Sequence, residues 1–430
     1  MKVCVMGLWH LGSVTAACLA SVGHQVTGFD FNERVISNLR KGQPPLFEPG
    51  LEDLIKTGLA DGRLRFTADP EQAFQSAEIV WVTYDTPVDE EDHADVDYVL
   101  DRVKKVIPKL ISSTLVLISS QLPVGSTRQL EAACRGLDIN ISFAYSPENL
   151  RLGKAIEVFN HPDRFVVGTR SQQDQDKIKK LLAPITDKIE WMSVESAEMT
   201  KHALNAFLAT SVVFINEIAL LCEMVGADAK EVERGLKSEA RIGPKAYLSP
   251  GGAFAGGTLA RDITFLIDSG VRYQQPAILF TAVKASNDTH KLWPRQKLGQ
   301  QFSDLKGKVI AIWGLTYKPG TDTLRRSSSI ELCQWLLDQG AVVQAHDPAV
   351  NHLPKKLAAI HLCKTPEAAL EDASALVIAT EWPDYRQIDP EIFLFQMASP
   401  LILDPNAFII RSLKNTSQVK YITVGKTIGD

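Results

Sequence analysis

KVCVMGLWHLGSVTAACLASVGHQVTGFD, residues 2–30, is the most informative stretch for the architecture of this chain of 430 residues. An apolar strand at residues 3–6 meets a glycine turn, a helix of small residues follows, and a second strand at residues 25–29 ends in Asp30. This order is typical of a βαβ unit that binds a dinucleotide. The helix N-terminus faces the pyrophosphate, and an acidic residue about 20 positions further on accepts hydrogen bonds from a ribose.

The glycine turn matches the dinucleotide pattern incompletely. Gly7 and Gly12 fit the first and third glycines of GxGxxG, but Trp9 replaces the second, which normally lets the backbone reach the phosphates. We therefore expect the Trp9 ring to turn outward. The predicted cofactor-binding residues here are Gly7, Trp9, His10, Leu11, Gly12 and Asp30. Asp30 favours NAD as the cofactor, and a βαβ unit with a purely structural role is the alternative.

Two later stretches extend the same domain. AEIVWVTYDTP (77–87) and TLVLISSQLPVGST (114–127) each end an apolar strand in a polar loop. In an open α/β sheet the ligands bind at such loops, outside the carboxyl ends of the strands. Thr86, Pro87, Ser120 and Gln121 are therefore candidate lining residues, with ordinary turns as the alternative.

The C-terminal third repeats the pattern loosely. GKVIAIWGLTYKPGTDTLRRSSSIELCQWLLDQGAVVQAHDP (307–348) reads as a strand, a glycine turn, a helix and a strand ending in Asp347. Lys318, Arg325 and Arg326 give this turn a positive charge that suits a diphosphate, and a solvated basic loop is the alternative. The sequence thus predicts an α/β protein with two Rossmann-like doubly wound domains.

A long helical pattern from about Ser193 to Leu236 separates the two domains. Lys201 and Asn205 lie four residues apart on it, so they share one helix face. The pattern has more apolar positions than one buried face needs, which favours a homodimer formed through this region. A functional role for Lys201 competes with the simpler reading of a solvated helix charge.

The stretch GGAFAGGTLARD (251–262) follows, with four glycines ahead of Thr258 and Asp262. Glycines allow the backbone to approach a ligand closely or to adopt positive φ, so the stretch reads as a flexible turn at a site. A plain surface loop is the alternative.

Composition excludes several classes of protein. The net charge of −5, with 45% hydrophobic and 23% charged residues, gives no reason to expect nucleic acid or an anionic membrane as a partner. The N-terminus does not resemble a signal peptide, and the longest apolar run (207–222) contains Asn216 and Glu217 and is shorter than a membrane span. We expect a cytoplasmic protein. Its six scattered cysteines predict buried thiols and no metal site.

Several blocks along the chain resemble the UDP-glucose/GDP-mannose dehydrogenase family, most of all its UDP-glucose members. They are FEPGLEDLI (47–55), YDTPVDEED (84–92), LPVGST (122–127), SPENLRLGKA (146–155), AEMTKHALNAFLAT (197–210), RIGPKAYLSPGGAFAGGTLARD (241–262), GLTYKPGTDTLRRSS (314–328) and ATEWPDY (379–385). The resemblance implies an NAD-binding domain (1–194), a central helical dimerisation region (195–295) and a UDP-sugar-binding domain (305–430).

The resemblance also implies a reaction. The family oxidises a sugar's C6 alcohol to an aldehyde and then to an acid, passing a hydride to NAD each time, and a cysteine of the glycine loop captures the aldehyde. Thr258 stands where that cysteine is expected. Lys201, Asn205 and Asp262 keep their family positions, where Lys201 and Asn205 would stabilise an alkoxide and hold a water that Asp262 orients.

Three other positions depart from the family pattern, and a fourth keeps it. Gln121 replaces a threonine, Leu152 replaces the second acidic residue of the 146–155 block, and Arg261 replaces a lysine, whereas Glu148 survives as the first acidic residue. The catalytic candidates are Lys201, Asn205, Asp262, Thr258 and Glu148. The resemblance assigns substrate binding to Glu148, Leu150, Arg151, Lys201, Asn205, Arg241, Phe254, Gly257, Tyr317, Lys318 and Arg325.

Three functions remain open on these residues. The first is NAD-dependent oxidation of a nucleotide sugar with altered or partial chemistry. The second is full oxidation to a uronate by a water route, in which the hydrated aldehyde gives up the second hydride without an enzyme thiol. The third is a non-catalytic binder of NAD and nucleotide sugar. Retention of Lys201, Asn205 and Asp262 argues against the third, because a binder needs no alkoxide site.

Overall fold

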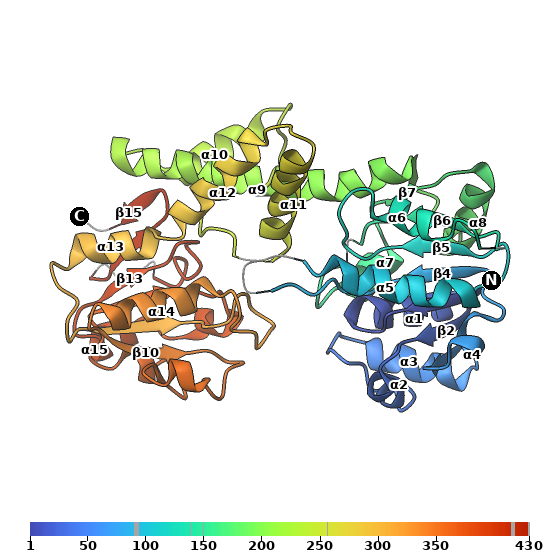
Figure 1. The fold of residues 1–430 in the computed structure, drawn as a ribbon. Coiled ribbons are helices and arrows are strands. Elements are labelled where there is room, and N and C mark those ends of the chain that lie inside the picture. Colours follow the sequence, from blue (N-terminus) through green and yellow to red (C-terminus); the bar gives the residue numbers. More distant parts are fainter. Residues whose placement is uncertain (90–93, 138, 149, 256, 414–417, 429–430) are drawn as a thin grey trace. The chain divides into compact units, whose positions relative to one another are not determined.

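The computed structural model describes residues 1–89, 94–137, 139–148, 150–255, 257–413 and 418–428. The chain divides into two compact units, Met1–Ala203 and Leu204–Asp430, called here the first and the second unit. Each unit is built on one largely parallel sheet with helices on both faces (Figure 1).

The first unit holds an eight-stranded sheet in the order β3-β2-β1-β4-β5-β6-β7-β8, in which only the β6–β7 pair is antiparallel. Its strands are β1 (Lys2–Met6), β2 (Gln25–Phe29), β3 (Leu64–Thr67), β4 (Ile79–Val82), β5 (Leu115–Ile118), β6 (Ser142–Tyr145), β7 (Phe165–Gly168) and β8 (Ile189–Met192). Its helices are α1 (His10–Ser21), α2 (Glu33–Leu39), α3 (Leu51–Ala60), α4 (Pro70–Phe74), α5 (Val96–Val106), η1 (Ile107–Lys109), α6 (Ser126–Ala133), α7 (Ala155–Asn160) and α8 (Gln172–Leu182).

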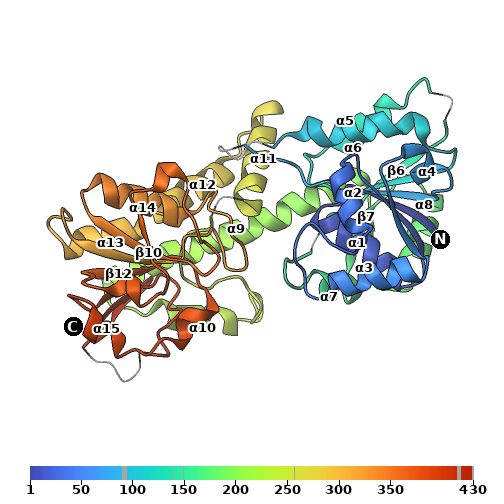
Figure 2. The ribbon, with the colours of Figure 1, turned by 90° about the horizontal axis from the view of Figure 1, so that it is seen from below.

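Successive side chains of these strands point to opposite faces of the sheet and pack into two hydrophobic cores. One core lies between the sheet and α1, α3, α7 and α8, and the other lies between the sheet and α4, α5, α6 and the start of the next helix, α9 (Val194–Val225). Figure 2 shows α1 and α3 over the first of these faces. The chain reverses its direction of winding between β1 and β4, which pair in parallel, and ligands of such sheets bind at this crossing point.

The second unit holds a seven-stranded sheet in the order β11-β10-β9-β12-β13-β14-β15, with only the β14–β15 pair antiparallel. Its strands are β9 (Val309–Trp313), β10 (Val342–His346), β11 (His361–Leu362), β12 (Ala375–Ile378), β13 (Leu401–Leu403), β14 (Lys420–Thr423) and β15 (Lys426–Ile428). Its helices are α10 (Ala229–Ser238), α11 (Thr258–Arg272), α12 (Ile278–His290), α13 (Trp293–Gln301), α14 (Ser328–Asp338), η2 (Lys355–Leu357), η3 (Ala368–Leu370), η4 (Pro383–Gln387) and α15 (Ile392–Gln396). A small separate core joins α9, α11 and α12.

These sheets confirm the predicted fold class of two Rossmann-like doubly wound sheets with a long helix between them in sequence. Two predictions about the central region need correction. The helical pattern of residues 193–236 is two helices, because α9 ends at Val225, Gly226 takes φ 74°, and the Asp228 side chain caps α10. Thr258 is not the middle of a flexible turn but the first residue of α11, which also contains Asp262.

The length of α9 corrects a third expectation. The apolar run at 207–222 is part of a helix of 32 residues, which is long and apolar enough to cross a membrane by length and composition alone. Its polar side chains nevertheless make protein contacts: Asn216 accepts from Gly251 N at 3.0 Å, and Glu223 pairs with Lys297 at 2.5 Å. These are the contacts of a helix packed within a protein, and length was the wrong reason to exclude a membrane span.

Candidate active site

The first glycine turn of the chain is closed so tightly that two of its positions require glycine. Gly7 takes φ 97° and donates its N–H to Phe29 O at 2.9 Å. A Cβ added to Gly12 would lie 1.8 Å from Gly7 O, and one added to Gly7 would lie 2.7 Å from the Tyr84 ring. Strand β1 therefore passes into α1 after only three residues, with backbone close to backbone.

The start of α1 suits an anion. Trp9 is its N-cap residue and no side chain caps the first turn, so the helix N-terminus keeps donors for a ligand. Trp9 as a residue is 48% exposed. The Asp30 carboxylate, just beyond β2, accepts from Leu8 N at 2.8 Å and Asn32 N at 2.9 Å. These residues fit the pyrophosphate and the adenosine ribose of NAD.

The loops after β4 and β5 meet at one edge of the sheet. Thr86 is buried and donates its hydroxyl to Gln121 O at 2.6 Å, whereas Pro87 is exposed. Sequence reasoning missed Thr83, whose buried hydroxyl donates to Gly7 O at 2.8 Å and so supports the glycine turn. Its place directly after the apolar run of β4 was the available signal.

Glu148 and Lys201 are brought together in the first unit. The Lys201 ammonium donates to the main-chain oxygen of Glu148 at 2.5 Å, so Lys201 is not a plain solvated charge. Burial raises the pKa of the Glu148 carboxyl, and the positive charge of Lys201 opposes that rise. Glu148 and Leu150 also line a cavity of about 50 Å³, whereas Arg151 is exposed.

Asn205 and Asp262 are brought together in the second unit. The Asn205 amide donates to the Asp262 carboxylate, and both side chains are buried, on α9 and α11 respectively. Thr258 is exposed at the start of α11, after Gly257 with φ 132°, and no side chain caps this helix. Gly256 lies outside the described residues.

Polar side chains anchor the glycine loop ahead of α11, and sequence reasoning did not find them. Asn287 accepts from Phe254 N at 3.0 Å and donates to Phe254 O at 2.9 Å. His290 Nε2 lies 2.8 Å from Gly251 O, and Asn406 accepts from Gly252 N at 2.7 Å. Isolated amides in α12 and after β13 carry no local motif, so only the tertiary structure reveals this role.

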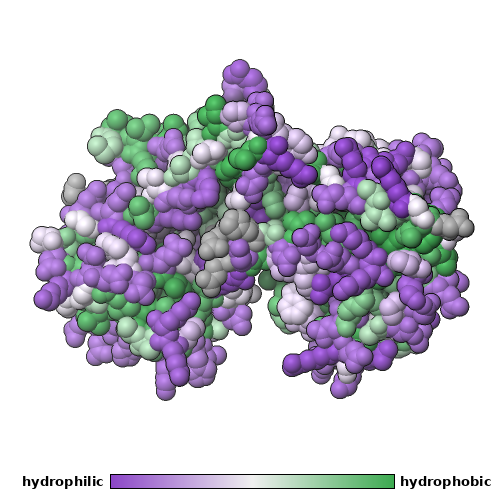
Figure 3. Space-filling view, in the orientation of Figure 1, coloured by the Kyte–Doolittle hydropathy of each residue, from purple (hydrophilic) through white to green (hydrophobic). Residues whose placement is uncertain are grey.

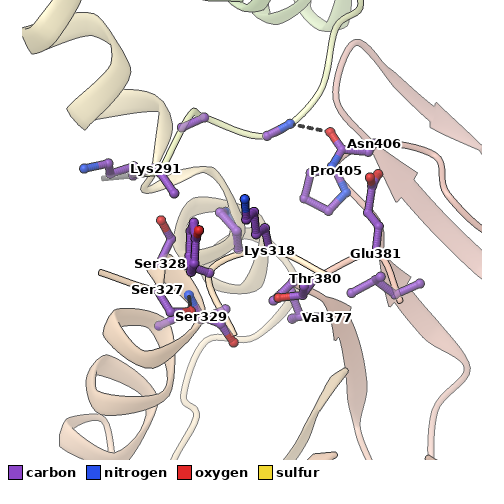
Figure 4. Close-up of a pocket in the computed structure, with 18 of the residues that line it drawn as sticks. Lys291, Lys318, Ser327, Ser328, Ser329, Val377, Thr380, Glu381, Pro405 and Asn406 are labelled. Carbon is purple, nitrogen blue, oxygen red and sulfur yellow. Dashed lines mark hydrogen bonds between the residues drawn. The ribbon is translucent and has the colours of Figure 1, made fainter. Parts of the chain in front are cut away.

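The second unit holds a cavity of about 440 Å³ at the carboxyl edge of its sheet (Figure 4). Lys318 points into it, with Ser327–Ser329 of the α14 start on one side and Glu381 on the other. Burial raises the pKa of Glu381. The lining also includes Tyr247, Gly252, Ala253, Ala255, Lys291, Thr316, Tyr317, Thr380, Pro405 and Asn406.

Not every residue that the resemblance assigned to the substrate lines this cavity. Tyr317 and Lys318 do, but Arg241, Phe254 and Arg325 do not. The Arg241 guanidinium pairs with Glu239 at 3.0 Å and is largely exposed, while Phe254 packs against the core of α9, α11 and α12. A linear motif cannot separate such residues from the lining ones.

The cysteines are poor nucleophiles. Five of the six are buried and Cys134 is half-buried. Burial raises the pKa of Cys18 and of Cys333 to about 12 and raises that of Cys4 further, and a thiol must ionise to attack. Among the residues that the structure describes, no three His, Cys, Asp or Glu side chains group closely enough to hold a metal ion.

Comparison with known proteins identifies the family of the chain. Three models of one family match the chain: its NAD binding domain at residues 1–186, its central domain at 195–289 and its UDP binding domain at 311–410. UDP-glucose 6-dehydrogenase of Pseudomonas aeruginosa is 35% identical over 421 residues, covering 94% of this chain and 93% of that protein. The enzyme of the same name from Rhizobium meliloti is 34% identical, covering 99% of this chain and all of that protein.

A solved structure agrees with the sequence relatives. The UDP-glucose dehydrogenase of Pyrobaculum islandicum superposes with a TM-score of 0.85 at 29% identity, covering 96% of this chain and 95% of that one. The chain therefore belongs to the UDP-glucose/GDP-mannose dehydrogenase family, and is an NAD-dependent nucleotide-sugar dehydrogenase.

Proposed function

We propose that this protein oxidises a UDP-sugar of the glucose type at C6, using NAD, without a covalent enzyme intermediate. The relatives at 34–35% identity are UDP-glucose 6-dehydrogenases, which supports UDP-glucose as the first substrate to try. The observation that carries the proposal is the pairing of retained polar groups, Lys201 with Glu148 O and Asn205 with Asp262, in a chain in which five of the six thiols are buried.

The retained groups suit removal of a proton from an alcohol. Lys201 and Asn205 are one turn apart on α9, and an ammonium and an amide N–H are donors that stabilise a developing alkoxide. Asp262 holds the Asn205 amide in one orientation, as the carboxylate partner in a buried pair. NAD, when bound, accepts the hydride from the carbon. Burial raises the pKa of Glu148, which favours the protonated form of this carboxyl, and the positive charge of Lys201 opposes that rise.

Thr258 fits a supporting role better than a covalent one. A hydroxyl at neutral pH needs a base to become a nucleophile, and the sequence has no histidine between His202 and His290. We therefore assign Thr258 a hydrogen bond to the sugar or to a catalytic water. Without covalent capture, oxidation either stops at the aldehyde or continues through the hydrated aldehyde, and we favour the altered or partial reaction.

Counting NADH released per sugar consumed tests the proposal. The panel comprises UDP-, dTDP- and GDP-sugars, with Lys201→Ala as the matched inactive variant. One NADH per UDP-glucose indicates arrest at the aldehyde, and two indicate the acid by the water route. Absence of NADH with every sugar, in enzyme that binds both NAD and UDP, would contradict the proposed activity.

We also propose that the protein is a homodimer that pairs through its central helices. Large apolar side chains are exposed on α9 and α12, among them Phe207 (71%), Leu221 (61%) and Ile278 (77%). Figure 3 shows hydrophobic surface over the region of α9 and α10. Light scattering at micromolar concentration should give twice the mass of the chain, and a monomer would contradict the pairing. The cytoplasmic location stays a prediction.

A further inference from the structure

Glu48 is a buried carboxylate that joins three separate parts of the first unit. Its side chain is 1% exposed, and it belongs to the loop that leads into α3. Oε1 accepts from Ala155 N at 2.8 Å, while Oε2 accepts from Gly153 N at 2.8 Å and pairs with His10 Nε2 at 2.9 Å. Because a carboxylate only accepts, the His10 ring donates from Nε2.

The two ends of this connection are both places where ligands are expected. His10 is the first residue of α1, at the helix terminus that fits the pyrophosphate of NAD. Gly153 and Ala155 close the segment that begins at Ser146 and carries Glu148, with Asn149 outside the described residues. Lys201 holds the start of that segment through Glu148 O, so Glu48 fixes the end that Lys201 does not reach.

Capping a short helix explains only part of this arrangement. A carboxylate at the start of a helix needs only a backbone N–H group as partner, as at Asp69, which accepts from Glu71 N at the start of α4. The bond from His10 adds a link across 38 residues to the cofactor helix. Burial makes the link stiff, because a buried carboxylate that loses one of its donors is left with an uncompensated charge.

We propose that Glu48 and His10 are positioning residues that transmit NAD binding to the 146–155 segment. A phosphate held on the first turn of α1 restricts His10, His10 restricts the Glu48 carboxylate, and the carboxylate holds Gly153 N and Ala155 N. The segment that carries Glu148 is then ordered before the sugar arrives. The role of that segment in sugar binding rests on the proposed function, but its ordering by NAD does not.

Hydrogen exchange measured with and without NAD tests the proposal in the full-length protein. In the wild-type protein NAD should slow exchange at the Gly153 and Ala155 amides at least about fivefold, because their opening becomes rarer. His10→Phe keeps a ring of similar size and removes the donor. In this variant NAD, at concentrations that calorimetry shows to be saturating, should slow the two amides less than about twofold.

Matched variants separate transmission from simple destabilisation. Asp174→Asn weakens another buried carboxylate of the first unit, which is bonded to Ser142 and Ser171, and should leave the NAD effect at its wild-type size. If His10→Phe does not bind NAD, Glu48→Gln gives the same comparison with the cofactor turn intact. The proposal is overturned if NAD slows exchange at the two amides as much in His10→Phe or Glu48→Gln as in the wild type. It is also overturned if NAD does not slow this exchange in the wild type.

The kinetic constants give a second readout, which only an active enzyme can supply. His10→Phe and Glu48→Gln should each raise KM for the sugar more than KM for NAD. The double variant should be no worse than the poorer single variant, because both act through one connection. Additive losses would mean two independent structural roles. Failure to oxidise any sugar, with the exchange result as expected, would contradict the proposed function and leave this inference standing.

Discussion

The glycine turns that follow β1 and β9 share one backbone hydrogen bond but differ in how the next helix begins. Gly7 N donates to Phe29 O at 2.9 Å, and Gly314 N donates to His346 O at 2.8 Å, so each turn is pinned to the neighbouring strand. In the first unit α1 follows after three residues and no side chain caps it. In the second unit α14 follows only at Ser328, and Ser327 caps it.

The acidic residues at the ends of the second strands differ in the same sense. Asp30 of the first unit accepts two backbone N–H groups and is partly exposed. Asp347 of the second unit is buried and accepts from five donors, on Leu315, Thr316 (two), Ala349 and Trp382. The first turn leaves its helix start without a side-chain cap and its carboxylate partly exposed, whereas the second turn caps its helix and buries its carboxylate. In the second unit, Lys318 of the inserted loop lines the cavity.

Breaking the first turn should have the largest effect on ligand binding. Gly12→Ala places a Cβ 1.8 Å from Gly7 O, so the turn must open and the helix start must move. We expect NAD affinity to fall at least about 100-fold, the loss of roughly 3 kcal/mol, measured by calorimetry. Gly299→Ala in α13, where an added Cβ meets no atom within 4 Å, is the control and should bind NAD normally. Normal NAD binding by Gly12→Ala would remove the first turn as the cofactor site.

Exchanging each acid for its amide should sharpen the contrast between the units. Asp347→Asn removes charge from five hydrogen bonds in a buried site and should cost about 2 to 3 kcal/mol of unfolding free energy. Asp30→Asn should cost less stability but should raise turnover with NADP relative to NAD, because the carboxylate repels a 2′-phosphate. Chemical denaturation and paired cofactor assays measure the two effects. Wild-type turnover with NADP equal to that with NAD would contradict the assignment of Asp30.

Thr258 begins α11, another helix whose first turn has no side-chain cap, as in α1. If it gives one hydrogen bond to the sugar or a water, Thr258→Ala should lose about 1 to 3 kcal/mol of transition-state stabilisation, whereas Lys201→Ala should nearly abolish hydride transfer. Thr258→Cys should trap an aldehyde as a thiohemiacetal, visible as added mass on the intact protein. A sugar ester on Thr258 of the unmodified enzyme would overturn the non-covalent account.

The smallest effect that we expect is on stability in acid. Low pH should lower the free energy of unfolding of the first unit, because Glu195 becomes protonated. Hydrogen bonds from Arg170 lower the pKa of Glu195 from 4.5 to about 2, and Arg128 adds to them. A lowered carboxyl pKa stabilises the folded state above pH 4.5, and that stabilisation is lost as the pH falls toward 2. Glu195→Gln should therefore lose stability at pH 7 and show a smaller further loss at pH 3, measured by thermal unfolding. Glu190→Gln, at an exposed position, is the control. If Glu195→Gln and the wild type lost equal stability between pH 7 and pH 3, the assignment to Glu195 would be contradicted.

Local patterns predicted the fold because the first βαβ unit is short and self-contained. Its signals all lie within 30 residues: Gly7, Gly12, the strand at 25–29 and Asp30. The structure has β2 at the predicted bounds. The prediction was wrong at two helix boundaries, the end of α9 at Val225 and the start of α11 at Thr258. Gly226 and Gly257 each adopt positive φ, and whether a glycine ends a helix, begins one or sits within a loop depends on its surroundings.

The anchors of the site could not be read in the same way. Each of these side chains accepts a hydrogen bond from a backbone group far along the chain: Glu48 from 105 residues away, Asn287 from 33 and Asn406 from 154. Nothing in the neighbouring sequence indicates these partners. Family resemblance supplied Lys201, Asn205 and Asp262, and the structure pairs each with a polar group. Resemblance also supplied Arg241 and Phe254, which the second-unit cavity does not include. Their assignment to the substrate stays a prediction.

Calorimetric titration of Lys318→Ala with UDP and with NAD tests most directly whether the two glycine turns divide the ligands between them. Lys318 lines the cavity of the second unit, and loss of a charged donor to a phosphate is worth about 1.5 to 3 kcal/mol. We predict that UDP affinity falls at least about tenfold while NAD affinity stays within about twofold of wild type. Equal weakening of both ligands, or weakening of NAD alone, would contradict the division.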